Sequence, residues 1–251
     1  KYNSDGSKSW TRLIGGNSYD KADSVSASQD GAIYVAGTSY GNLDGQNNNG
    51  QEDAYIAKYN KDGSTAWTRL IGGKSPDYAN SVATASDGSI YIAGYTWSNL
   101  DGQNNSGQED GYIAKYNNDG TKAWTRLIGG VSPDYAYSVA VASDGSIYIA
   151  GNTKSNLDGQ YNSGESDAFI TKYSSDGSKV WTRLIGGTSF DYAYSVATAN
   201  DGSIYIAGST ESNLEGLPNS LGRDSFIAKY NSDGSRAWVR LIGRSSRDYV
   251  R

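Results

Sequence analysis

Residues 115–171 read KYNNDGTKAWTRLIGGVSPDYAYSVAVASDGSIYIAGNTKSNLDGQYNSGESDAFIT, and the chain is built from copies of this stretch. The phrase W-[TV]-R-L-I-G recurs in every copy, and its tryptophan is found 57 residues further on each time. The five tryptophans are Trp10, Trp67, Trp124, Trp181 and Trp238. A fixed period of this length is typical of a repeat architecture.

The composition excludes several classes of protein. The 251 residues include 12% aromatic and 20% charged side chains, which is enough apolar material for a folded core. The net charge is −5 and the basic residues are spread along the chain, unlike the basic patch of a nucleic-acid binder. No apolar run is long enough for a membrane span. The sequence has no Cys and no His, which removes thiolate metal sites and the commonest general base.

Each copy shows a four-strand pattern, here described for the second one. Tyr78–Ala85 and Ser89–Gly94 are the first two predicted strands, and Asp110–Tyr116 and Lys122–Ile128 are the third and fourth. A long loop, Trp97–Glu109, separates the second strand from the third and consists mostly of Asn, Gly, Gln and Asp. No segment shows helical periodicity of useful length. The pattern therefore predicts an all-β protein.

Asp-Gly pairs mark the turns between the predicted strands. Asp87-Gly88 and Asp119-Gly120 are predicted two-residue hairpin turns, because Gly tolerates the positive φ that such turns require. Asp5-Gly6 is interpreted in the same way, and Ser9–Ile14 after it is predicted to be a strand. These residues have the sequence of a fourth strand whose first three partners are not in this chain.

The repeated four-strand unit favours a β-propeller. A four-stranded sheet cannot bury both faces alone, whereas sheets stacked around an axis cover one another. A β-solenoid is the alternative, but its coils are usually much shorter. The expected divisions are a closing strand at 1–16, blades at 17–73, 74–130, 131–187 and 188–244, and the start of a further blade at 245–251. The chain starts in mid-repeat, so we expect it to be part of a longer protein.

The phrases DYANSVATASDGSIYIAGYT, NLDGQNNSGQEDGYIAKY and DGTKAWTRLIGG resemble the bacterial β-propeller repeats called SBBP, which occur in large secreted or cell-surface proteins. The resemblance covers the whole chain. It implies a propeller of four-stranded antiparallel blades, an extracellular or cell-surface setting, and a binding or scaffold role. It implies no particular chemistry.

The long loop is the candidate metal site, because it concentrates the hard oxygen ligands that Ca²⁺ prefers. Its spacing does not match an EF-hand, and in the fourth copy Leu217, Pro218 and Arg223 replace polar residues. The alternative is that Asn, Gly and Asp simply form turns. The candidate ligands are Asp44, Asn47, Asp53, Asp101, Asn104, Asn105, Glu109, Asp110, Asp158 and Asp167.

Two charged positions recur in every copy and have a structural alternative. The aspartate that begins the third strand, as at Asp53 and Asp110, is favoured as an acceptor of backbone N–H groups. The arginine two residues after each tryptophan, as at Arg69, shares the tryptophan's face of the strand. We expect it to stack on a neighbour's aromatic ring, not on that of its own strand, or to pair with an acid between blades.

Aromatic residues near the loops suggest a second kind of site. Trp97 has no aromatic counterpart in two of the other three copies, and with Tyr95, Tyr40 and Tyr161 it can form platforms on which sugar rings stack. This predicts lectin-like carbohydrate binding. The alternative is that Trp97 is a partly buried anchor of its loop.

The repeat favours binding over catalysis. An active site needs unlike residues that converge on one point, and near-identical blades supply the same residues repeatedly. The predicted function is thus a non-catalytic binding or scaffold module with a protein or glycan partner, and Ca²⁺ is the candidate cofactor. A glycosidase-like or quinone-dependent enzyme is the alternative. An incomplete ring exposes strand edges, which predicts either additional sequence that completes it or self-association.

Overall fold

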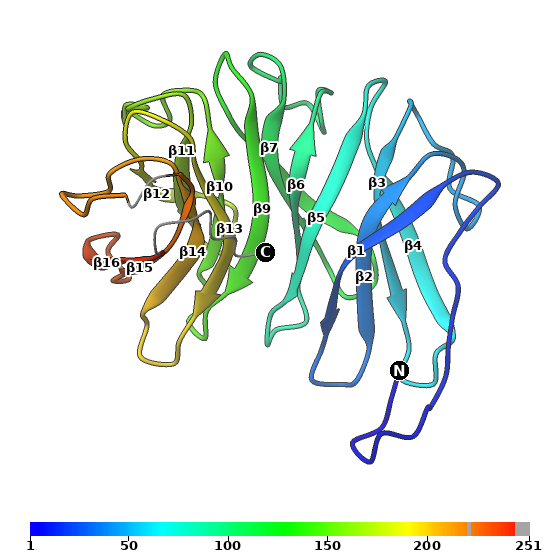
Figure 1. The fold of residues 1–251 in the computed structure, drawn as a ribbon. Helices are drawn as coiled ribbons and strands as arrows, with labels where there is room; N and C mark the ends of the chain where they lie inside the picture. The colour runs from blue at the N-terminus through cyan, green and yellow to red at the C-terminus, as the bar shows by residue number, and fades with distance from the viewer. Residues whose placement is uncertain (220–221, 244–251) are drawn as a thin grey trace.

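A computed structural model describes residues 1–219 and 222–243 and confirms the predicted propeller architecture. Within these residues, 16 strands form four antiparallel four-stranded sheets, each in chain order (Figure 1). The first sheet is β1 (Asp20–Ala27), β2 (Ile33–Ser39), β3 (Asp53–Tyr59) and β4 (Thr65–Ile71). The second is β5 (Asp77–Thr84), β6 (Ile90–Thr96), β7 (Asp110–Tyr116) and β8 (Lys122–Ile128). The third is β9 (Asp134–Val141), β10 (Ile147–Thr153), β11 (Asp167–Tyr173) and β12 (Lys179–Ile185). The fourth is β13 (Asp191–Thr198), β14 (Ile204–Thr210), β15 (Asp224–Tyr230) and β16 (Arg236–Ile242).

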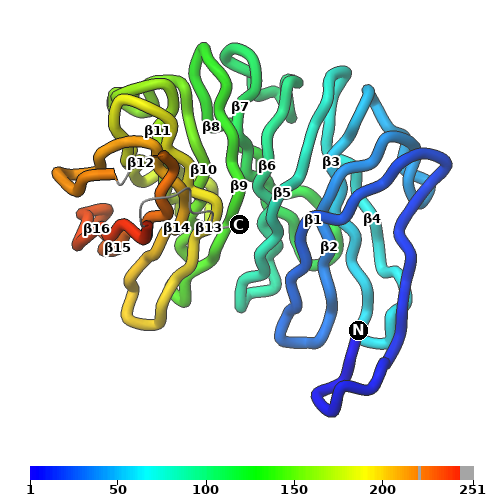
Figure 2. The backbone as a smooth tube through the Cα atoms, in the orientation of Figure 1, coloured from blue at the N-terminus to red at the C-terminus, as the bar shows by residue number. Residues whose placement is uncertain are grey.

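The four sheets are stacked side by side and fan out in an arc (Figures 1 and 2). The first strands of successive sheets contact one another, so β1, β5, β9 and β13 are the innermost strands of the blades. The sheets lie within the blade ranges expected from the sequence. The predicted start of a further blade at 245–251 lies outside the described residues.

The predicted turn type at the Asp-Gly pairs is wrong. Gly88 has φ of +82°, but Asp87 does not have a positive φ, which a two-residue type I′ turn would require. The Gly88 N–H donates to the Ala85 carbonyl and the Ala85 N–H donates to the Ser89 carbonyl. This is a three-residue connection with glycine in the left-handed position. The side chain of Asp87 accepts a hydrogen bond from the Ser89 N–H and closes the turn.

The strand predicted at Ser9–Ile14 does not form. The segment is extended and runs along the first sheet, as the blue trace in Figure 2 shows, but it pairs with no strand of the described residues. The physical reason is that backbone pairing needs a partner, and the described part of the chain places no third strand beside it. The hairpin before it does form, because Tyr2 bridges Lys8 and the Gly6 N–H donates to the Asn3 carbonyl.

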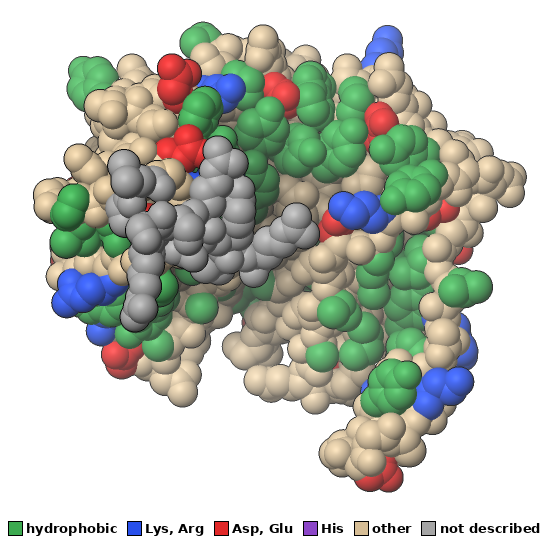
Figure 3. Space-filling model, in the orientation of Figure 1, with side chains coloured by type: hydrophobic (Ala, Val, Ile, Leu, Met, Phe, Trp, Pro, Cys, Tyr) green, Lys and Arg blue, Asp and Glu red, His purple; other side chains and the backbone are tan. Residues whose placement is uncertain are grey.

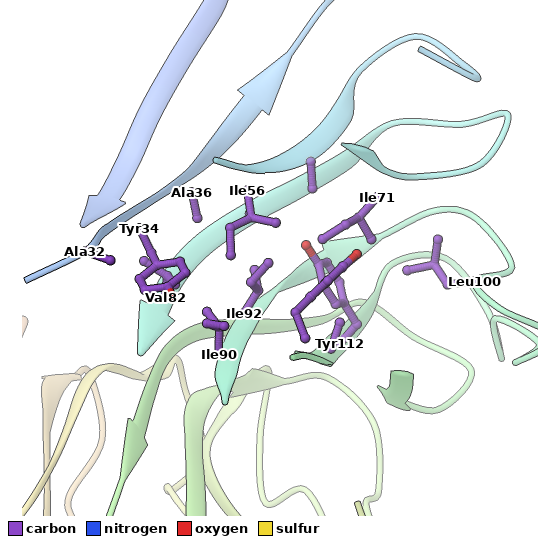
Figure 4. Close-up of a cluster of buried hydrophobic side chains, with 14 residues drawn as sticks. Ala32, Tyr34, Ala36, Ile56, Ile71, Val82, Ile90, Ile92, Leu100 and Tyr112 are labelled. Atoms are coloured by element: carbon purple, nitrogen blue, oxygen red, sulfur yellow. The ribbon is translucent and has the colours of Figure 1, made fainter. Parts of the chain in front are cut away.

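The core lies between the sheets, as the hydrophobic content of both strand faces predicts. Tyr34 and Ile56 of the first sheet project toward Val82, Ile90 and Ile92 of the second (Figure 4). Residues of opposite parity on the same strands, such as Tyr91, face the third sheet. Each inner sheet is therefore covered on both faces, and hydrophobic burial holds successive blades together.

Candidate ligand-binding face

Each innermost strand carries a β-bulge near its start. The register of the first two strands shifts by one residue in every sheet, which leaves one residue of the inner strand without a partner. The bulged residues are Asp23, Asn80, Tyr137 and Tyr194. They are aspartate, asparagine and, in the last two blades, tyrosine, although the residues around them are nearly identical. Because bulges change the direction of a side chain and occur often beside binding sites, these positions locate the candidate site.

The bulge requires a glycine on the neighbouring strand. A Cβ on Gly94 would lie 1.8 Å from the Tyr78 carbonyl oxygen, and the equivalent Gly37, Gly151 and Gly208 show the same close approach. The second strand therefore contains Ala-Gly at this level in every copy, which lets the inner strand come close. This close approach holds in place the start of each innermost strand, where the bulged side chains lie.

The bulges and the strand starts bring aromatic rings into one continuous group. We call it the aromatic face, and its members are Tyr78, Tyr95, Trp97, Tyr135, Tyr137, Tyr192 and Tyr194. Ring centroids of Tyr78 and Tyr95 are 4.9 Å apart, and Tyr95 is 4.9 Å from Tyr135. Tyr137 continues the group to Tyr194 at 5.7 Å. The rings thus form a partly buried platform that crosses three blades.

A cavity of about 300 Å³ lies at one end of the aromatic face. Tyr78 and Tyr95 line one part of it, and Tyr19 and Tyr40, which contact each other edge to face, line another. Polar side chains complete the lining: Lys21, Asp23, Thr38 and Asn80. Figure 3 shows hydrophobic side chains gathered in the upper middle of the view, with acidic side chains among them. The cavity combines ring surfaces with donors and acceptors, as small-molecule sites usually do.

Burial raises the pKa of two tyrosines of the cavity, Tyr78 and Tyr95. Burial, with a smaller contribution from Glu52, raises the pKa of Tyr78 to about 12. Burial also raises the pKa of Tyr95, with Glu109 the next contributor. Lys21 and Asp23 form an ion pair of 2.6 Å, and the hydrogen bond from Lys21 to Asp23 raises the pKa of Lys21. The cavity lining thus offers tyrosine hydroxyls together with the Lys21–Asp23 ion pair.

Three of the four predicted ligand-binding aromatics are brought together here. Tyr95 contacts Trp97 at 5.6 Å between ring centroids, and Tyr40 lines the same cavity as Tyr95. Tyr161 does not belong to the group, since it lies on a loop with 80% of its surface exposed. The interpretation of the sequence missed the inner-strand tyrosines. Alternating tyrosines in D-Y-A-Y at residues 134–137 and 191–194 were the available signal, because residues i and i+2 of a strand share a face.

The predicted metal ligands of the long loop are mostly engaged by neighbouring side chains. Asp101 accepts hydrogen bonds from Thr125 and Lys122, and Asp158 accepts them from Thr182 and Lys179. Asp44 accepts one from Thr68 at 2.6 Å. Within residues 1–219 and 222–243 no group of three or more His, Cys, Asp or Glu side chains is placed to hold a metal. Ca²⁺ binding by these loops stays a prediction.

The amides of the loop have different positions. Asn105 folds the loop, because its side-chain amide donates to the Thr96 and Gln108 carbonyls and its oxygen accepts from the Gly107 N–H. Asn47 and Asn104 are not among the residues that bond the loop together in this way. Glu109 accepts a hydrogen bond of 2.7 Å from the Tyr135 hydroxyl and so belongs to the aromatic face instead.

The aspartates that begin the third strands accept hydrogen bonds from backbone N–H groups, which is the structural role predicted for them. Asp53, Asp110 and Asp167 are buried, and one carboxylate oxygen of each accepts a backbone N–H, from Asn49, Ser106 and Ser163. Burial raises the pKa of all three. The other oxygen of each is buried without a hydrogen-bond partner among the described residues. These carboxylates lie beneath the loops.

The recurring arginine makes a different contact from the one predicted. Arg69 lies over the ring of its own strand's Trp67, 5.6 Å from the centroid, and donates to the Gly120 carbonyl of the next blade. The ring that it contacts is thus its own blade's, and its partner in the next blade is a backbone carbonyl rather than an acid. The Trp67 indole N–H donates to the Asn118 carbonyl of the next blade as well. Both side chains hold blades together through backbone carbonyls.

The fold and the aromatic face define a β-propeller with a candidate site at one end of its inner strands. The model of the SBBP β-propeller repeat matches residues 9–44, 66–101, 123–158 and 180–215. The chain belongs to this repeat family. A second model, a β-propeller domain of unknown function called DUF5122, matches residues 28–65, 85–122 and 199–236.

Two curated proteins are similar to this chain. The regulatory protein FlaEY of Caulobacter vibrioides is 28% identical over 193 residues, which cover 69% of this chain and 20% of that protein. An uncharacterised WD repeat-containing protein, L264, of Acanthamoeba polyphaga mimivirus is 24% identical over 232 residues, with 72% and 17% covered. The chain spans a fifth or less of these relatives.

A solved structure shares the fold. The crystal structure of a protein of unknown function from Bacteroides caccae has a TM-score of 0.50 and 12% identity, and the match covers 95% of this chain and 73% of that one. In the part of the chain that the structure describes, no helix has the length and apolar character of a membrane span.

Proposed function

We propose that this protein is a non-catalytic binding module that takes carbohydrate on the aromatic face, with the cavity beside Tyr95 as the principal subsite. The observation that carries the proposal is the cavity of about 300 Å³ lined by four tyrosines and by Lys21, Asp23, Thr38 and Asn80. An extracellular or cell-surface setting is part of the proposal and agrees with such a ligand.

The chemistry of a sugar matches this lining. A pyranose ring has an apolar face of C–H groups that packs on an aromatic ring and a rim of hydroxyls that needs donors and acceptors. Tyr78 and Tyr95 are stacked with an interplanar angle of 21° and supply the ring surface. Lys21 and Asp23 supply a donor and an acceptor on the same side, which suits neutral hydroxyl groups better than a single charge.

The lining also supports a binding role over a catalytic one. Sugar hydrolysis uses two carboxyl groups on opposite sides of the bond that breaks. Among the described residues that line the cavity, Asp23 is the only carboxylate, and it is paired with Lys21. No His is present in the sequence to serve as a base. This lining suits holding a sugar better than hydrolysing one.

A glycan array followed by titration of the bound sugars tests the proposal. We expect Tyr95→Ala to weaken binding about fivefold, because loss of one stacked ring is worth roughly 1 kcal/mol. Tyr161→Ala is the matched control, since Tyr161 is exposed and away from the cavity. Equal loss in both variants, or no sugar bound by the wild-type protein, would contradict the carbohydrate proposal.

A further inference from the structure

One face of the first sheet, the face that points away from the second sheet, is uncovered in the described residues. In each later sheet the equivalent face packs against the sheet before it. Val25, Val82, Val139 and Val196 occupy the same position of the repeat. Val25 is 67% exposed, whereas Val82, Val139 and Val196 are 6%, 6% and 7% exposed. Figure 3 shows hydrophobic side chains over β1 and β2, beside the N-terminal segment. The face that blade stacking buries elsewhere is therefore uncovered here by the described residues.

An apolar cavity of about 290 Å³ marks the uncovered place. Its lining includes Trp10, Ile14, Val25, Ile33, Val35 and Tyr59. At the equivalent place over the second sheet, Tyr34, Ala36 and Ile56 of the first sheet fill the space against Val82, Ile90 and Ile92 (Figure 4). Tyr34 and Ala36 come from a second strand and Ile56 from a third. A segment that fills this cavity in the same way therefore has residues equivalent to Tyr34 and Ala36 on a second strand and to Ile56 on a third strand.

One strand of a preceding blade is already represented in the chain, because Trp10 and Arg12 make the contacts that a fourth strand makes with the next blade. The Trp10 indole N–H donates to the Lys61 carbonyl at 3.2 Å, as the Trp67 indole donates to the Asn118 carbonyl one repeat later. Arg12 donates to the Gly63 carbonyl, as Arg69 does to the Gly120 carbonyl. Ser9–Ile14 thus lies where the fourth strand of a preceding blade would lie.

The hairpin before this segment shows how the preceding strands would connect. Asn3–Ser7 forms the same three-residue turn that joins the third strand to the fourth at Asn60–Ser64, with a glycine N–H donating to the asparagine carbonyl in both. Tyr2 and Lys8 form a bridge across it. Lys1 and Tyr2 are therefore in the place where a third strand ends.

We propose that the open face of the first sheet binds the first three strands of one more copy of this repeat, joined to Lys1 in the same polypeptide, with Ser9–Ile14 as their fourth strand. A second copy of this chain does not fit through its last blade. Its last blade has its own fourth strand, β16, which would have to occupy the space that Ser9–Ile14 already fills. The occupant is a three-stranded partial blade and not a complete one.

A cysteine probe tests this proposal directly, because the chain has no Cys of its own. Residues 131–171, which contain β9, β10 and β11 as far as Thr171, are placed before Lys1, so that Lys1 and Tyr2 supply the last two residues of the third strand. The new junction Thr-Lys is then the same as the natural Thr171–Lys172. Val25→Cys is made in the original and in the extended chain, and its reaction with a maleimide is followed. We expect the extension to slow the reaction about tenfold or more, because labelling then requires local opening.

Three controls accompany the probe. Val82→Cys, which is buried, should react slowly in both chains, and Val131→Cys, which is exposed, should react rapidly in both. Changing Tyr148 and Ile170 to Asp in the added copy alone should restore rapid labelling of Val25→Cys, because these residues correspond to Tyr34 and Ile56. Near-ultraviolet circular dichroism confirms that each variant is folded.

Two results would overturn the proposal. One is equal labelling of Val25→Cys in the original and extended chains while both buried and exposed controls behave as expected. The other is protection of Val25→Cys in the original chain as its concentration rises, which would assign the face to a second copy.

Discussion

Asp101 illustrates how single residues shape the long loop. It has φ of +50° and Gly102 has φ of +75°, and Leu100 and Gln103 exchange two backbone hydrogen bonds around them. This is the two-residue hairpin turn that sequence analysis assigned to other Asp-Gly pairs. The aspartate tolerates the left-handed conformation, and its carboxylate then bonds Thr125 and Lys122 of β8. The loop is held to the outer strand by this residue.

Replacing this aspartate should therefore cost stability. We expect Asp101→Ala to lower the free energy of unfolding by about 1–2 kcal/mol, because Thr125 loses its acceptor and alanine is strained at positive φ. Asn104→Ala, in the same loop, should change it by less than about 0.5 kcal/mol. Urea unfolding measures both in chelator and in calcium. A cost for Asp101→Ala that appears only in calcium would indicate that the loop binds the metal.

At the scale of the element, the bulged inner strand determines the candidate site. Tyr135 and the bulged residue Tyr137 are stacked with parallel rings, 6.2 Å between centroids, because residues i and i+2 of a strand share a face. Positions that pack between blades are nearly the same in every copy, since each contact has to be repeated. The bulged positions vary more, and their contacts with the next blade vary with them: the Asn80 amide donates to the Ala136 carbonyl, whereas the Tyr137 ring contacts the Tyr194 ring.

The glycine opposite the bulge should be nearly irreplaceable. We expect Gly94→Ala to destabilise the protein by about 3 kcal/mol or more, because the new methyl group would lie 1.8 Å from a backbone carbonyl. Gly102→Ala is the matched control: its new methyl group would meet none of the described atoms within 4 Å, so it costs only about 1 kcal/mol for its positive φ. Thermal unfolding compares the two. Equal losses would mean that the inner strand can move away from β6.

At the scale of the whole molecule, stacking buries carboxylates at every junction between blades. Asp77, Asp134 and Asp191 begin inner strands and lie near the Asp that begins a third strand in the preceding blade: a Cβ on Gly72 would be 2.2 Å from an oxygen of Asp53 and 2.8 Å from one of Asp77. Burial raises the pKa of Asp77 and of Asp134 to about 6. Hydrogen bonds from Thr96 and the Gly73 N–H oppose this rise at Asp77.

These junctions predict the pH dependence of stability. A carboxyl whose pKa is raised in the folded state contributes stability that is present below its unfolded pKa, near 3.8, and is lost as the pH rises through about 6. Turn aspartates such as Asp62 change the stability in the opposite direction, since hydrogen bonds from Ser64 lower its pKa. The change in stability that they cause occurs at pH values below about 4, outside this range. We therefore expect the free energy of unfolding to decrease from about pH 4.5 to about pH 7.

Urea unfolding at several pH values measures this decrease, and Asp134→Asn should reduce the slope. Asparagine removes the titrating group and keeps one acceptor oxygen, whereas in Asp134 one carboxylate oxygen accepts from Thr153 and the other from the Gly130 N–H. Thr11→Ala, at an exposed position, should leave the slope unchanged. A stability that rises steadily over the same pH range would contradict the assignment of the slope to these carboxyls.

The fold class follows from the repeat itself. A period of 57 residues with four strands in each copy leaves stacked sheets as the way to bury Tyr34, Ile56 and Ile92. Trp97, Tyr95 and Tyr40 could be named as candidates from the sequence because they stand near the loops. The sequence could not predict which of these aromatic rings lie close together. Tyr161 also stands in a loop between a second and a third strand, and yet it lies apart from the others.

The sequence alone thus determined the class of fold, the blades and the family, because these depend on hydrophobic alternation and turn residues that act locally and recur. Only the tertiary structure decided the candidate site and the open face of the first sheet. The site depends on the contacts that the bulged residues make with the next blade, such as Asn80 with the Ala136 carbonyl and Tyr137 with Tyr194. The open face depends on which blade lies next to Val25. Both depend on contacts between segments far apart in the chain: the local D-Y-A-Y phrases indicate which tyrosines share a face of a strand, but not which rings of other strands they meet.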